Sequence, residues 1–276
     1  MLADTSTVQA EDGRTLAFCE WGDRTGRPVW YLHGSPGSRY LHPREFDVTT
    51  WGVRMLTYDR PGYGRSDRRP GRLVADAAED VRAIADHLSL AEFAVVGVSA
   101  GGPHALAVAA ELAGRVTRCA VVNGLAPPDA EGFDFYAGMA ESEVEEWRAR
   151  TLSSPDAAAI LNETRQWVEE LVASPDIPPA AKEVFVPTLT EAISRGPWGI
   201  LDDYAALTRS WGFELGAVTC PVTLMVAEAD TSVPPAHGRW LADHLPRATS
   251  LSVPGGHLDP RTAATEQLLA WAVERL

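Results

Sequence analysis

The sequence predicts an α/β fold in which helices cover both faces of a mostly parallel, eight-stranded sheet, with a helical insertion. Three observations support this prediction. Short apolar runs typical of buried strands alternate with segments in which apolar residues recur at helical spacing. This alternation stops near Pro127, and only helical patterns occur from there to Ser210. It resumes at Pro221, so the insertion interrupts one α/β domain and need not fold independently.

An antiparallel hairpin is expected at the start of the chain. Residues 6–10 and 14–21 flank Asp12-Gly13, a pair that favours a tight turn with positive φ. Strands and helices then alternate, which is typical of a parallel sheet. The expected strands are 28–33, 54–59, 93–99 and 118–124, and the expected helices are 39–51, 73–88 and 103–113.

The insertion carries helical patterns that prolines separate. They cover residues 141–152, 155–174, 179–194 and 199–211. The chain then returns to strands at 221–228 and 248–253, with helices near 235–245 and at 260–275. The expected organisation is a core domain of residues 1–126 and 201–276 and a helical cap insertion of residues 127–200.

Composition and charge narrow the class of partner. The 276 residues are 45% hydrophobic and carry a formal net charge of −14, from 38 acidic and 24 basic residues. Nucleic acid and anionic membrane surfaces favour basic partners, so the acidic balance argues against both. The one lysine, Lys182, lies in a polar, proline-bounded stretch. Schiff-base chemistry needs a desolvated lysine, so lysine-based covalent catalysis is disfavoured.

Cysteine spacing and the N-terminal residues give further expectations. Cys19, Cys119 and Cys220 show no spacing typical of a metal site, so buried free thiols are expected, with no metal and no cofactor. Residues 1–13 contain acids where an export signal has basic and apolar residues. Residues 93–110 lack charge, but their glycines and proline indicate a strand, a turn and a helix rather than a membrane span. The expected location is therefore cytoplasmic, without membrane insertion.

The segment GVSAGG at residues 97–102 is the main candidate for a catalytic feature. It matches G-x-S-x-G, with Gly97, Ser99 and Gly101 in the fixed positions, between a buried strand and an alanine-rich helix. Serine on such a strand-to-helix turn takes an unfavourable backbone conformation, and a Cβ two residues away on either side would crowd it. The alternative, a phosphate-binding glycine loop, would need G-x-G-x-x-G or a following Lys-Ser/Thr pair, and neither is present.

A nucleophilic serine needs a base, and seven histidines compete for that role. His257 is favoured, because it lies in a loop after the last expected strand, where Gly255 and Gly256 let the backbone project it. His87, His237 and His244 are expected to be solvated, and His104 is expected to be packed. His33 is expected to hold its own loop, and His42 has no strand to fix it.

The base needs an orienting carboxylate, and Asp230 is the candidate. It lies just past the strand at 221–228 and one strand–helix unit before His257. The order Ser99, Asp230, His257 is the one expected for this architecture. The rejected positions are Glu228, expected to lie within the strand, Asn123, whose amide carries no charge, and Asp202 and Asp203, expected on a polar helix face.

Acyl transfer also needs hydrogen-bond donors for the developing oxyanion. The N–H of Ala100, in the turn, is one candidate. The second is expected from the loop HGSPGS at residues 33–38, which begins with His33-Gly34. Pro36 has no N–H, so Ser35 is the expected donor, with help from its hydroxyl.

These motifs resemble those of the α/β-hydrolase fold superfamily, and in particular its small capped hydrolases with an HG-x-P loop. The motifs occur in the family's order and span nearly the whole chain. They are HGSPGS (33–38), YDRPGYGRSD (58–67), GVSAGG (97–102), VAEADTSVP (226–234) and PGGHLDP (254–260).

The resemblance implies roles for particular residues. Ser99 would be the nucleophile, His257 the base and Asp230 the acid, with Ser35 and Ala100 as the oxyanion donors. A further group is implied to shape a structural turn rather than act chemically: Asp59, Arg60, Gly62 and Gly64.

Departures from the family narrow the expected reaction. Haloalkane dehalogenases and epoxide hydrolases of this fold carry aspartate where Ser99 stands, which disfavours those reactions. Proline iminopeptidases carry a GGPG loop where this chain has HGSPGS, which disfavours peptide substrates. Four acids of the insertion could bind an amino terminus, but their spacing is more typical of a solvated helix face: Glu141, Glu143, Glu145 and Glu146.

The leading hypothesis is a serine hydrolase that acts through an acyl-enzyme on a small or medium uncharged carboxylic ester or lactone. The same site could instead serve acyl transfer, C–C bond hydrolysis or natural-product tailoring, since fold does not decide the reaction. A non-catalytic ligand receptor is a third hypothesis, against which the complete triad argues. The expected partner is thus a small acyl substrate. A minority of the insertion's aromatic residues are expected to line an apolar pocket above Ser99: Phe133, Phe135, Tyr136, Trp147, Trp167, Phe185 and Trp198.

Overall fold

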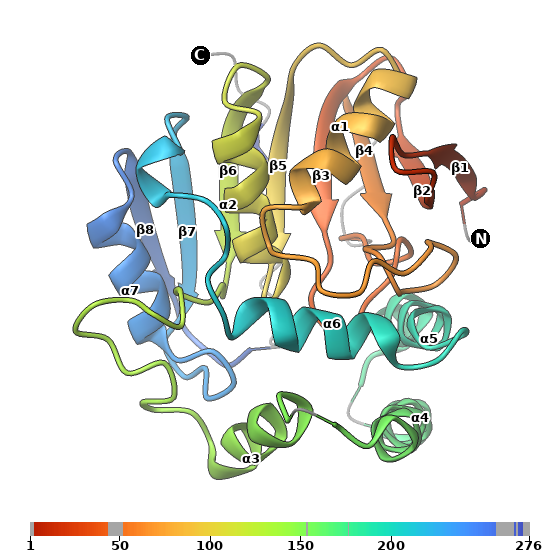
Figure 1. The fold of residues 1–276 in the computed structure, drawn as a ribbon, viewed down its shortest axis with the longest axis vertical. Helices are drawn as coiled ribbons and strands as arrows, with labels where there is room; N and C mark the ends of the chain where they lie inside the picture. The colour runs from red at the N-terminus through yellow and green to blue at the C-terminus, as the bar shows by residue number, and fades with distance from the viewer. Residues whose placement is uncertain are drawn as a thin grey trace.

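One sheet of eight strands runs through the residues that the computed structural model describes, which are 3–43, 52–152, 154–175, 177–257, 268 and 270–272. The strand order is β1-β2-β4-β3-β5-β6-β7-β8 (Figure 1). β2 pairs antiparallel with β1 and β4, and the remaining neighbours pair in parallel, so the predicted mostly parallel, eight-stranded sheet is confirmed. The strands cover Ser6–Gln9 (β1), Thr15–Gly22 (β2), Arg27–Leu32 (β3), Val53–Tyr58 (β4), Phe93–Val98 (β5), Val116–Val122 (β6), Val222–Ala227 (β7) and Ala248–Val253 (β8).

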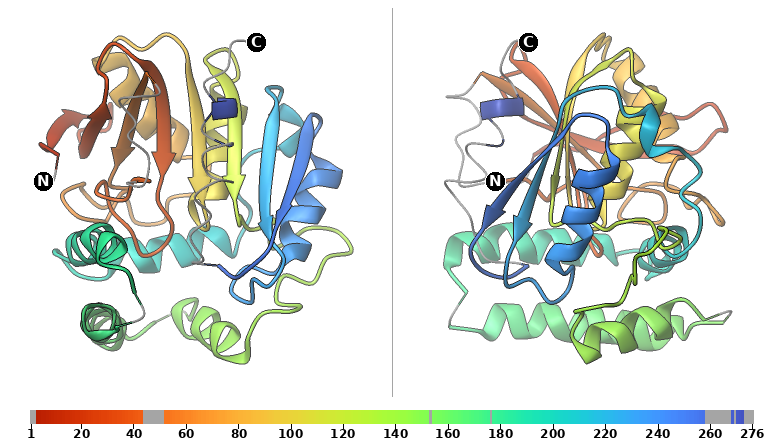
Figure 2. Two further views of the ribbon diagram at one scale, coloured as in Figure 1. Left: turned by 180° about the vertical axis from the view of Figure 1, so that it is seen from behind. Right: turned by 90° about the vertical axis from the view of Figure 1, so that its left-hand side faces the viewer.

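Helices cover both faces of this sheet, as predicted. On one face lie α1 (Ala77–His87), α2 (Gly101–Glu111) and α7 (Pro235–His244), and α2 packs against β5 and β6 (Figure 1). Nearly all of α2 is buried, which its small residues allow. On the opposite face, Leu268 and Ala272 pack with apolar side chains of β3, β4 and β5 (Figure 2).

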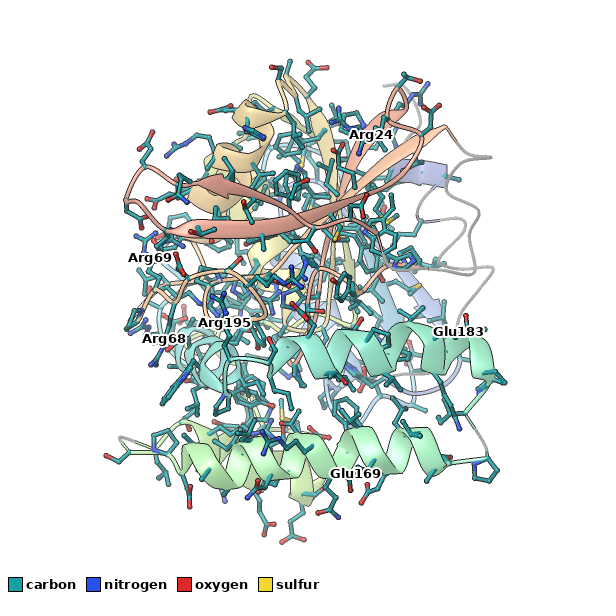
Figure 3. All side chains as sticks on the ribbon, turned by 90° about the vertical axis from the view of Figure 1, so that its right-hand side faces the viewer. Arg24, Arg68, Arg69, Glu169, Glu183 and Arg195 are labelled. Atoms are coloured by element: carbon teal, nitrogen blue, oxygen red, sulfur yellow. The ribbon has the colours of Figure 1, made fainter. Side chains whose placement is uncertain are left out.

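The helices described between β6 and β7 lie beyond the carboxyl ends of the parallel strands (Figures 1 and 2). α6 (Trp198–Leu207) crosses next to the strand ends, and α3 (Glu141–Arg150) and α4 (Ala157–Ala173) lie further out. α5 (Pro179–Ala192) packs against α4, and Figure 3 shows the two helices side by side. These helices therefore form a layer over the edge of the sheet at which the predicted site residues lie.

Several predicted helix boundaries differ from the structure. Residues 39–43 form a turn and irregular backbone rather than the start of a helix, and residues 44–51 lie outside the described residues. Of the helix predicted at 260–275, residues 268 and 270–272 are helical, and the rest lies outside the described part. The helix predicted from residue 73 begins at Ala77, because Leu73 N donates to Asp76 Oδ2 at 2.7 Å and closes a turn.

The three cysteines are buried free thiols, as predicted. Burial raises the pKa of the Cys19 and Cys220 thiols to about 11, so both stay protonated at neutral pH and neither offers a thiolate nucleophile. None of the described helices combines the length and the apolar character that crossing a bilayer requires.

Candidate active site

Ser99 occupies a tight turn between β5 and α2. β5 ends at Val98 and α2 begins at Gly101. The φ of Ser99 is 54°, in the left-handed region that residues with a side chain rarely adopt. Two backbone hydrogen bonds hold the turn: Ser99 N donates to Val122 O of β6, and Gly102 N donates to Ser99 O, both at 2.8 Å. Backbone strain fixed in this way by neighbouring elements is typical of residues at reactive sites.

Gly97 and Gly101 are needed because backbone segments approach each other closely at the turn. A Cβ on Gly97 would come within 2.7 Å of Ala105 Cβ and overlap the Gly101 carbonyl. A Cβ on Gly101 would lie 2.7 Å from His33 O and overlap the Leu32 carbonyl. The crowding predicted at the glycines therefore comes from α2 and from the end of β3, rather than from Ser99 itself. This contact packs the turn directly against the loop that follows β3.

The structure brings Ser99, Asp230 and His257 together at the carboxyl edge of the sheet. Asp230 follows β7 and His257 follows β8. His257 Nε2 lies 3.0 Å from Ser99 Oγ, and His257 Nδ1 lies 2.6 Å from Asp230 Oδ2. The Asp230 side chain is fully buried, and that of His257 is 18% exposed. The Asp230 carboxylate accepts a hydrogen bond from Nδ1, so an imidazole with a single proton carries it on Nδ1, and its Nε2 can then accept a hydrogen bond from the Ser99 hydroxyl.

Backbone amides fix the other oxygen of Asp230. Ser232 N and Val233 N donate to Oδ1 at 2.9 and 2.8 Å, so the carboxylate has one orientation. Glu228, the rival position, is directed elsewhere: its oxygens bind Arg239 at 2.5 Å and Ser252 at 2.6 Å on the surface. The geometry thus joins Asp230, and not Glu228, to His257.

Asn123 links the loops that carry Asp230 and His257. It follows β6 with a φ of 48°, a conformation that asparagine tolerates better than most residues. Its Oδ1 accepts from Ala227 N at 3.0 Å, and its Nδ2 donates to His257 O at 3.3 Å. From its position in the sequence, Asn123 is excluded as the acid because an amide carries no charge, and this linking role is not predicted. The signal that was present is its position at the end of the strand next to β7.

The loop after β3 packs against the Ser99 turn. A Cβ on Gly34 would lie 3.3 Å from Ser99 Cβ, so glycine lets the loop approach Ser99 closely. His33 is buried and holds this loop as expected, since its Nδ1 donates to Gly34 O at 2.6 Å. Among the described residues, neither the Ser35 N–H nor the Ala100 N–H donates to another group. Both amides therefore remain able to donate to a ligand atom.

Two predicted surface carboxylates are buried instead, so that expectation is wrong. Asp202 and Asp203 lie on α6, where Asp202 pairs with Arg68 and Asp203 pairs with Arg60 and Arg72. Burial alone would raise the carboxyl pKa, but the two guanidiniums outweigh it and hold the pKa of Asp203 well below its ordinary value. Helical periodicity marks both acids as polar, but it does not show that arginines from a distant loop lie opposite them.

His237 is also buried, so the prediction that it is solvated is wrong. Its Nδ1 accepts from Ala126 N at 3.0 Å, and its ring meets the edges of Phe133 and Phe135. Burial lowers the pKa of His237 to about 4, so the imidazole is neutral in the folded protein. The physical reason is that Ala126, Phe133 and Phe135, in the segment after β6, pack against His237 in the first turn of α7 and exclude water from its ring. His87 and His244 are exposed, as expected.

Replacing His237 by asparagine should weaken the acid sensitivity of folding. Between pH 6 and pH 5 the unfolded histidine, with its ordinary pKa near 6.5, is mostly protonated, while the folded one stays neutral. The wild type should therefore lose about 1 kcal/mol more of its free energy of unfolding per pH unit than His237→Asn over this interval. Urea unfolding at several pH values measures both slopes. Equal slopes would contradict the buried neutral state.

The aromatic residues of the insertion pack mainly with one another and with the core. Phe135 and Trp147 are buried, with ring centroids 5.3 Å apart, and Trp147 lies 4.4 Å from Tyr204 of α6. Trp198 is 39% exposed and lies over the Arg68 guanidinium at 4.5 Å. Phe135 and Trp147 therefore serve to attach the outer helices to α6. An aromatic lining of a pocket above Ser99 stays a prediction.

Comparison with known proteins places the fold. A family model described as alpha/beta hydrolase fold matches residues 27–260. The chain belongs to the α/β-hydrolase fold family. The hydrolase YcgS of Bacillus subtilis (strain 168), described as uncharacterized, is 27% identical to this α/β hydrolase over 253 residues, which cover 85% of this chain and 84% of that protein.

Two solved structures illustrate the likeness of fold. The esterase RhEst1 from Rhodococcus sp. ECU1013 has a TM-score of 0.73 at 20% identity, and the match covers 98% of this chain and 99% of that one. The enol-lactonase from Burkholderia xenovorans LB400 has a TM-score of 0.71 at 21% identity, and the match covers 98% and 100%. At these identities the comparison establishes a shared fold.

Proposed function

We propose that this α/β hydrolase is a serine hydrolase that cleaves acyl substrates through an acyl-enzyme. The observation that carries the proposal is the hydrogen-bonded chain from Ser99 Oγ through His257 to the buried Asp230. A serine hydroxyl alone is a weak nucleophile, and this chain supplies both a base and the carboxylate that orients it. The position of Ser99 in a strained turn supports the same role.

In the proposed reaction, Ser99 Oγ attacks the carbonyl carbon of the substrate while His257 Nε2 takes the serine proton. The oxygen that becomes negative accepts hydrogen bonds from the N–H groups of Ser35 and Ala100. The intermediate then collapses: the bond to the leaving oxygen breaks, and His257 returns the proton to that oxygen. Water repeats the sequence on the acyl-serine, releasing a carboxylic acid and restoring the Ser99 hydroxyl. Asp230 stays ionised throughout.

The proposed substrate class is an uncharged carboxylic ester or lactone. The two guanidiniums behind the loop after β3, those of Arg60 and Arg72, are buried and bound to Asp203, so neither is placed to form a direct ion pair with a substrate carboxylate. The structural neighbours that are an esterase and an enol-lactonase support ester and lactone substrates. We further propose that residues 127–200 act as a cap that encloses the acyl group next to Ser99.

Labelling with a fluorophosphonate tests the proposal. Its phosphorus should be attacked by an activated serine oxygen, with loss of fluoride, so mass spectrometry should find one adduct on the peptide that contains Ser99. A parallel panel of esters, lactones, thioesters and amides, with alcohols added alongside water, identifies the preferred acyl group and acceptor. Folded protein that neither labels nor turns over any member of the panel would contradict the proposal and favour a ligand receptor.

A further inference from the structure

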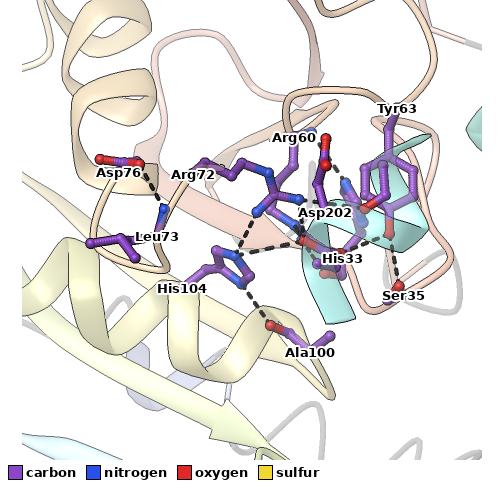
Figure 4. Close-up of polar contacts among 12 residues, drawn as sticks. His33, Ser35, Arg60, Tyr63, Arg72, Leu73, Asp76, Ala100, His104 and Asp202 are labelled. Atoms are coloured by element: carbon purple, nitrogen blue, oxygen red, sulfur yellow. Dashed lines mark hydrogen bonds and ion pairs between the residues drawn. The ribbon is translucent and has the colours of Figure 1, made fainter. Parts of the chain in front are cut away.

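A buried group of polar side chains lies behind the loop after β3 and connects it to α6 and α2. We call these residues, Arg60, Tyr63, Arg72, His104 and Asp203, the Asp203 network, and Figure 4 labels all of them except Asp203. Asp203 Oδ2 accepts from Arg60 Nη2 at 2.6 Å and from the Tyr63 hydroxyl at 2.7 Å, and Asp203 Oδ1 accepts from Arg72 Nη2 at 2.5 Å. The charged side chains of the network are almost fully buried. The network reaches both predicted oxyanion residues, Ser35 and Ala100.

At the Ser35 end, the direction of each hydrogen bond follows from the charge of Asp203. The ionised carboxylate accepts only, so the single hydroxyl hydrogen of Tyr63 is donated to Asp203 Oδ2. The Tyr63 oxygen is then left as an acceptor for Ser35 Oγ, which lies 2.7 Å away. The Ser35 hydroxyl therefore donates to Tyr63. This corrects the expectation that the Ser35 hydroxyl itself helps to bind the oxyanion, because its hydrogen is already engaged.

Arg60 contacts the backbone of this loop, next to Ser35. Its guanidinium donates to the carbonyl of His33, and its Nη2 donates to Gly34 O at 3.0 Å. The Gly34 carbonyl and the Ser35 N–H belong to one peptide unit, so the cation polarises that unit and fixes its plane. The peptide unit that carries the predicted oxyanion donor is thus held at the Gly34 carbonyl by Arg60, and the Ser35 side chain is held by Tyr63.

At the Ala100 end, His104 completes the network. Its Nδ1 donates to Ala100 O at 2.7 Å, and its Nε2 lies 3.3 Å from Arg72 Nη1, from which it accepts. Burial, to which the nearby Arg60 adds, lowers the pKa of His104 to about 3, so the ring is neutral. Two guanidiniums thus face one carboxylate, which leaves one positive charge in the network. This charge favours a developing anion at the neighbouring amides.

Tyr63 has a site shaped to its ring. The ring meets His33 edge-on with a centroid distance of 5.0 Å, and a Cβ on Gly199 at the start of α6 would overlap it. Gly199 N also donates to Gly62 O at 3.1 Å, which joins α6 to the turn that carries Tyr63. The hydroxyl is therefore directed by packing from both sides, and its removal leaves the ring in place.

We propose that Tyr63 is a positioning residue for the oxyanion hole. It acts by accepting the hydrogen bond of the Ser35 hydroxyl, while Asp203 fixes the Tyr63 hydroxyl and Arg60 fixes the peptide unit of Ser35. The inference rests on the proposed hydrolase function. It predicts that the Tyr63 hydroxyl matters in the transition state, in which the Ser35 N–H donates to the negatively charged oxygen, and matters little for substrate binding. Tyr63→Phe should therefore lower kcat about tenfold, less than the roughly 10²-fold cost of losing a whole donor, with KM unchanged within about twofold.

The matched control is Tyr58→Phe. Tyr58 is a buried tyrosine of β4 whose hydroxyl finds no hydrogen-bond partner among the residues that the structure describes. Its removal should leave kcat and KM for p-nitrophenyl acetate at wild-type values. A thermal unfolding curve for each variant verifies that the proteins compared are folded.

A double-mutant cycle with Ser35→Ala separates positioning from general structural support. Ser35→Ala keeps the backbone N–H and removes only the hydroxyl, so it should lower kcat to the same extent as Tyr63→Phe. In the Ser35→Ala protein, Tyr63→Phe should change kcat by less than about twofold. Independent effects that multiply, or a Tyr63→Phe protein as active as Tyr58→Phe, would overturn this inference while the wild type remains active. A wild type that neither hydrolyses esters nor labels would instead overturn the proposed function, and this inference with it.

Discussion

Ser99→Ala should lower kcat/KM for p-nitrophenyl acetate by about 10⁶-fold, the scale on which removal of a serine nucleophile acts. The variant should also lose fluorophosphonate labelling completely. The physical reason is the loss of the one oxygen that lies 3.0 Å from His257 Nε2. The remaining amides of Ser35 and Ala100 can still bind an oxyanion, so a small residual rate above that of water is expected.

Ser89→Ala is the matched control for this substitution. Ser89 follows α1 with a φ of 55°, almost the same left-handed conformation as Ser99. Any general effect of placing alanine in that conformation should appear in both variants, and thermal unfolding measures it. Ser89→Ala should keep wild-type activity and labelling. If the Ser99→Ala protein still hydrolysed the ester and the Ser89→Ala protein did not, the assignment of Ser99 as the nucleophile would be wrong.

The proximity of Ser99, Asp230 and His257, which the sequence predicts and the structure shows, depends on local signals. Ser99 lies in a five-residue pattern between a buried strand and an alanine-rich helix, and each piece of that pattern is contiguous in the chain. Asp230 and His257 each lie within four residues of the end of a strand. In a parallel sheet the ends of such strands meet at one edge, so chain order and strand endings are enough to bring the three side chains together. The structure places them within hydrogen-bonding distance, and their chemical roles stay predictions.

The Asp203 network could not be predicted from the sequence, because its members lie far apart along the chain. Arg60 and Arg72 lie in the loop after β4, His104 lies in α2, and Asp203 lies in α6. Each looks like a polar residue of its own segment, and only the packing of α6 against that loop buries them together. Isolated burial of any one would be costly, so their burial depends on mutual pairing. No local pattern records that pairing.

The assignment of α6 illustrates a related limit. The predicted boundary between insertion and core falls at residue 200, inside α6, because helical patterns look alike on both sides of it. In the structure α6 contacts the core through Asp203 and Gly199, and it contacts the outer helices through Tyr204 and Trp147. α6 therefore belongs to the site as much as to the insertion, since movement of this helix would disturb the loop that carries Ser35.

Asp230→Asn should lower kcat by about 10⁴-fold while leaving the fold intact. The amides of Ser232 and Val233 donate to Oδ1, so the carbonyl oxygen of an asparagine must take that position. Its NH₂ group is then forced toward His257 Nδ1, where the carboxylate oxygen now lies at 2.6 Å. Nδ1 would have to accept that hydrogen bond, and the imidazole proton would move to Nε2. Histidine in this tautomer cannot take the Ser99 proton.

Glu228→Gln is the matched control, because it removes a carboxylate two residues away that bonds only Arg239 and Ser252 among the described residues. It should keep wild-type kcat. The pair of variants therefore separates the orienting carboxylate from general loss of negative charge near β7, and steady-state kinetics with p-nitrophenyl acetate measures both. Thermal unfolding should give Asp230→Asn a midpoint close to that of the wild type, since its two backbone hydrogen bonds persist. A loss of kcat in Glu228→Gln as large as that in Asp230→Asn would mean that neither acid acts specifically through His257.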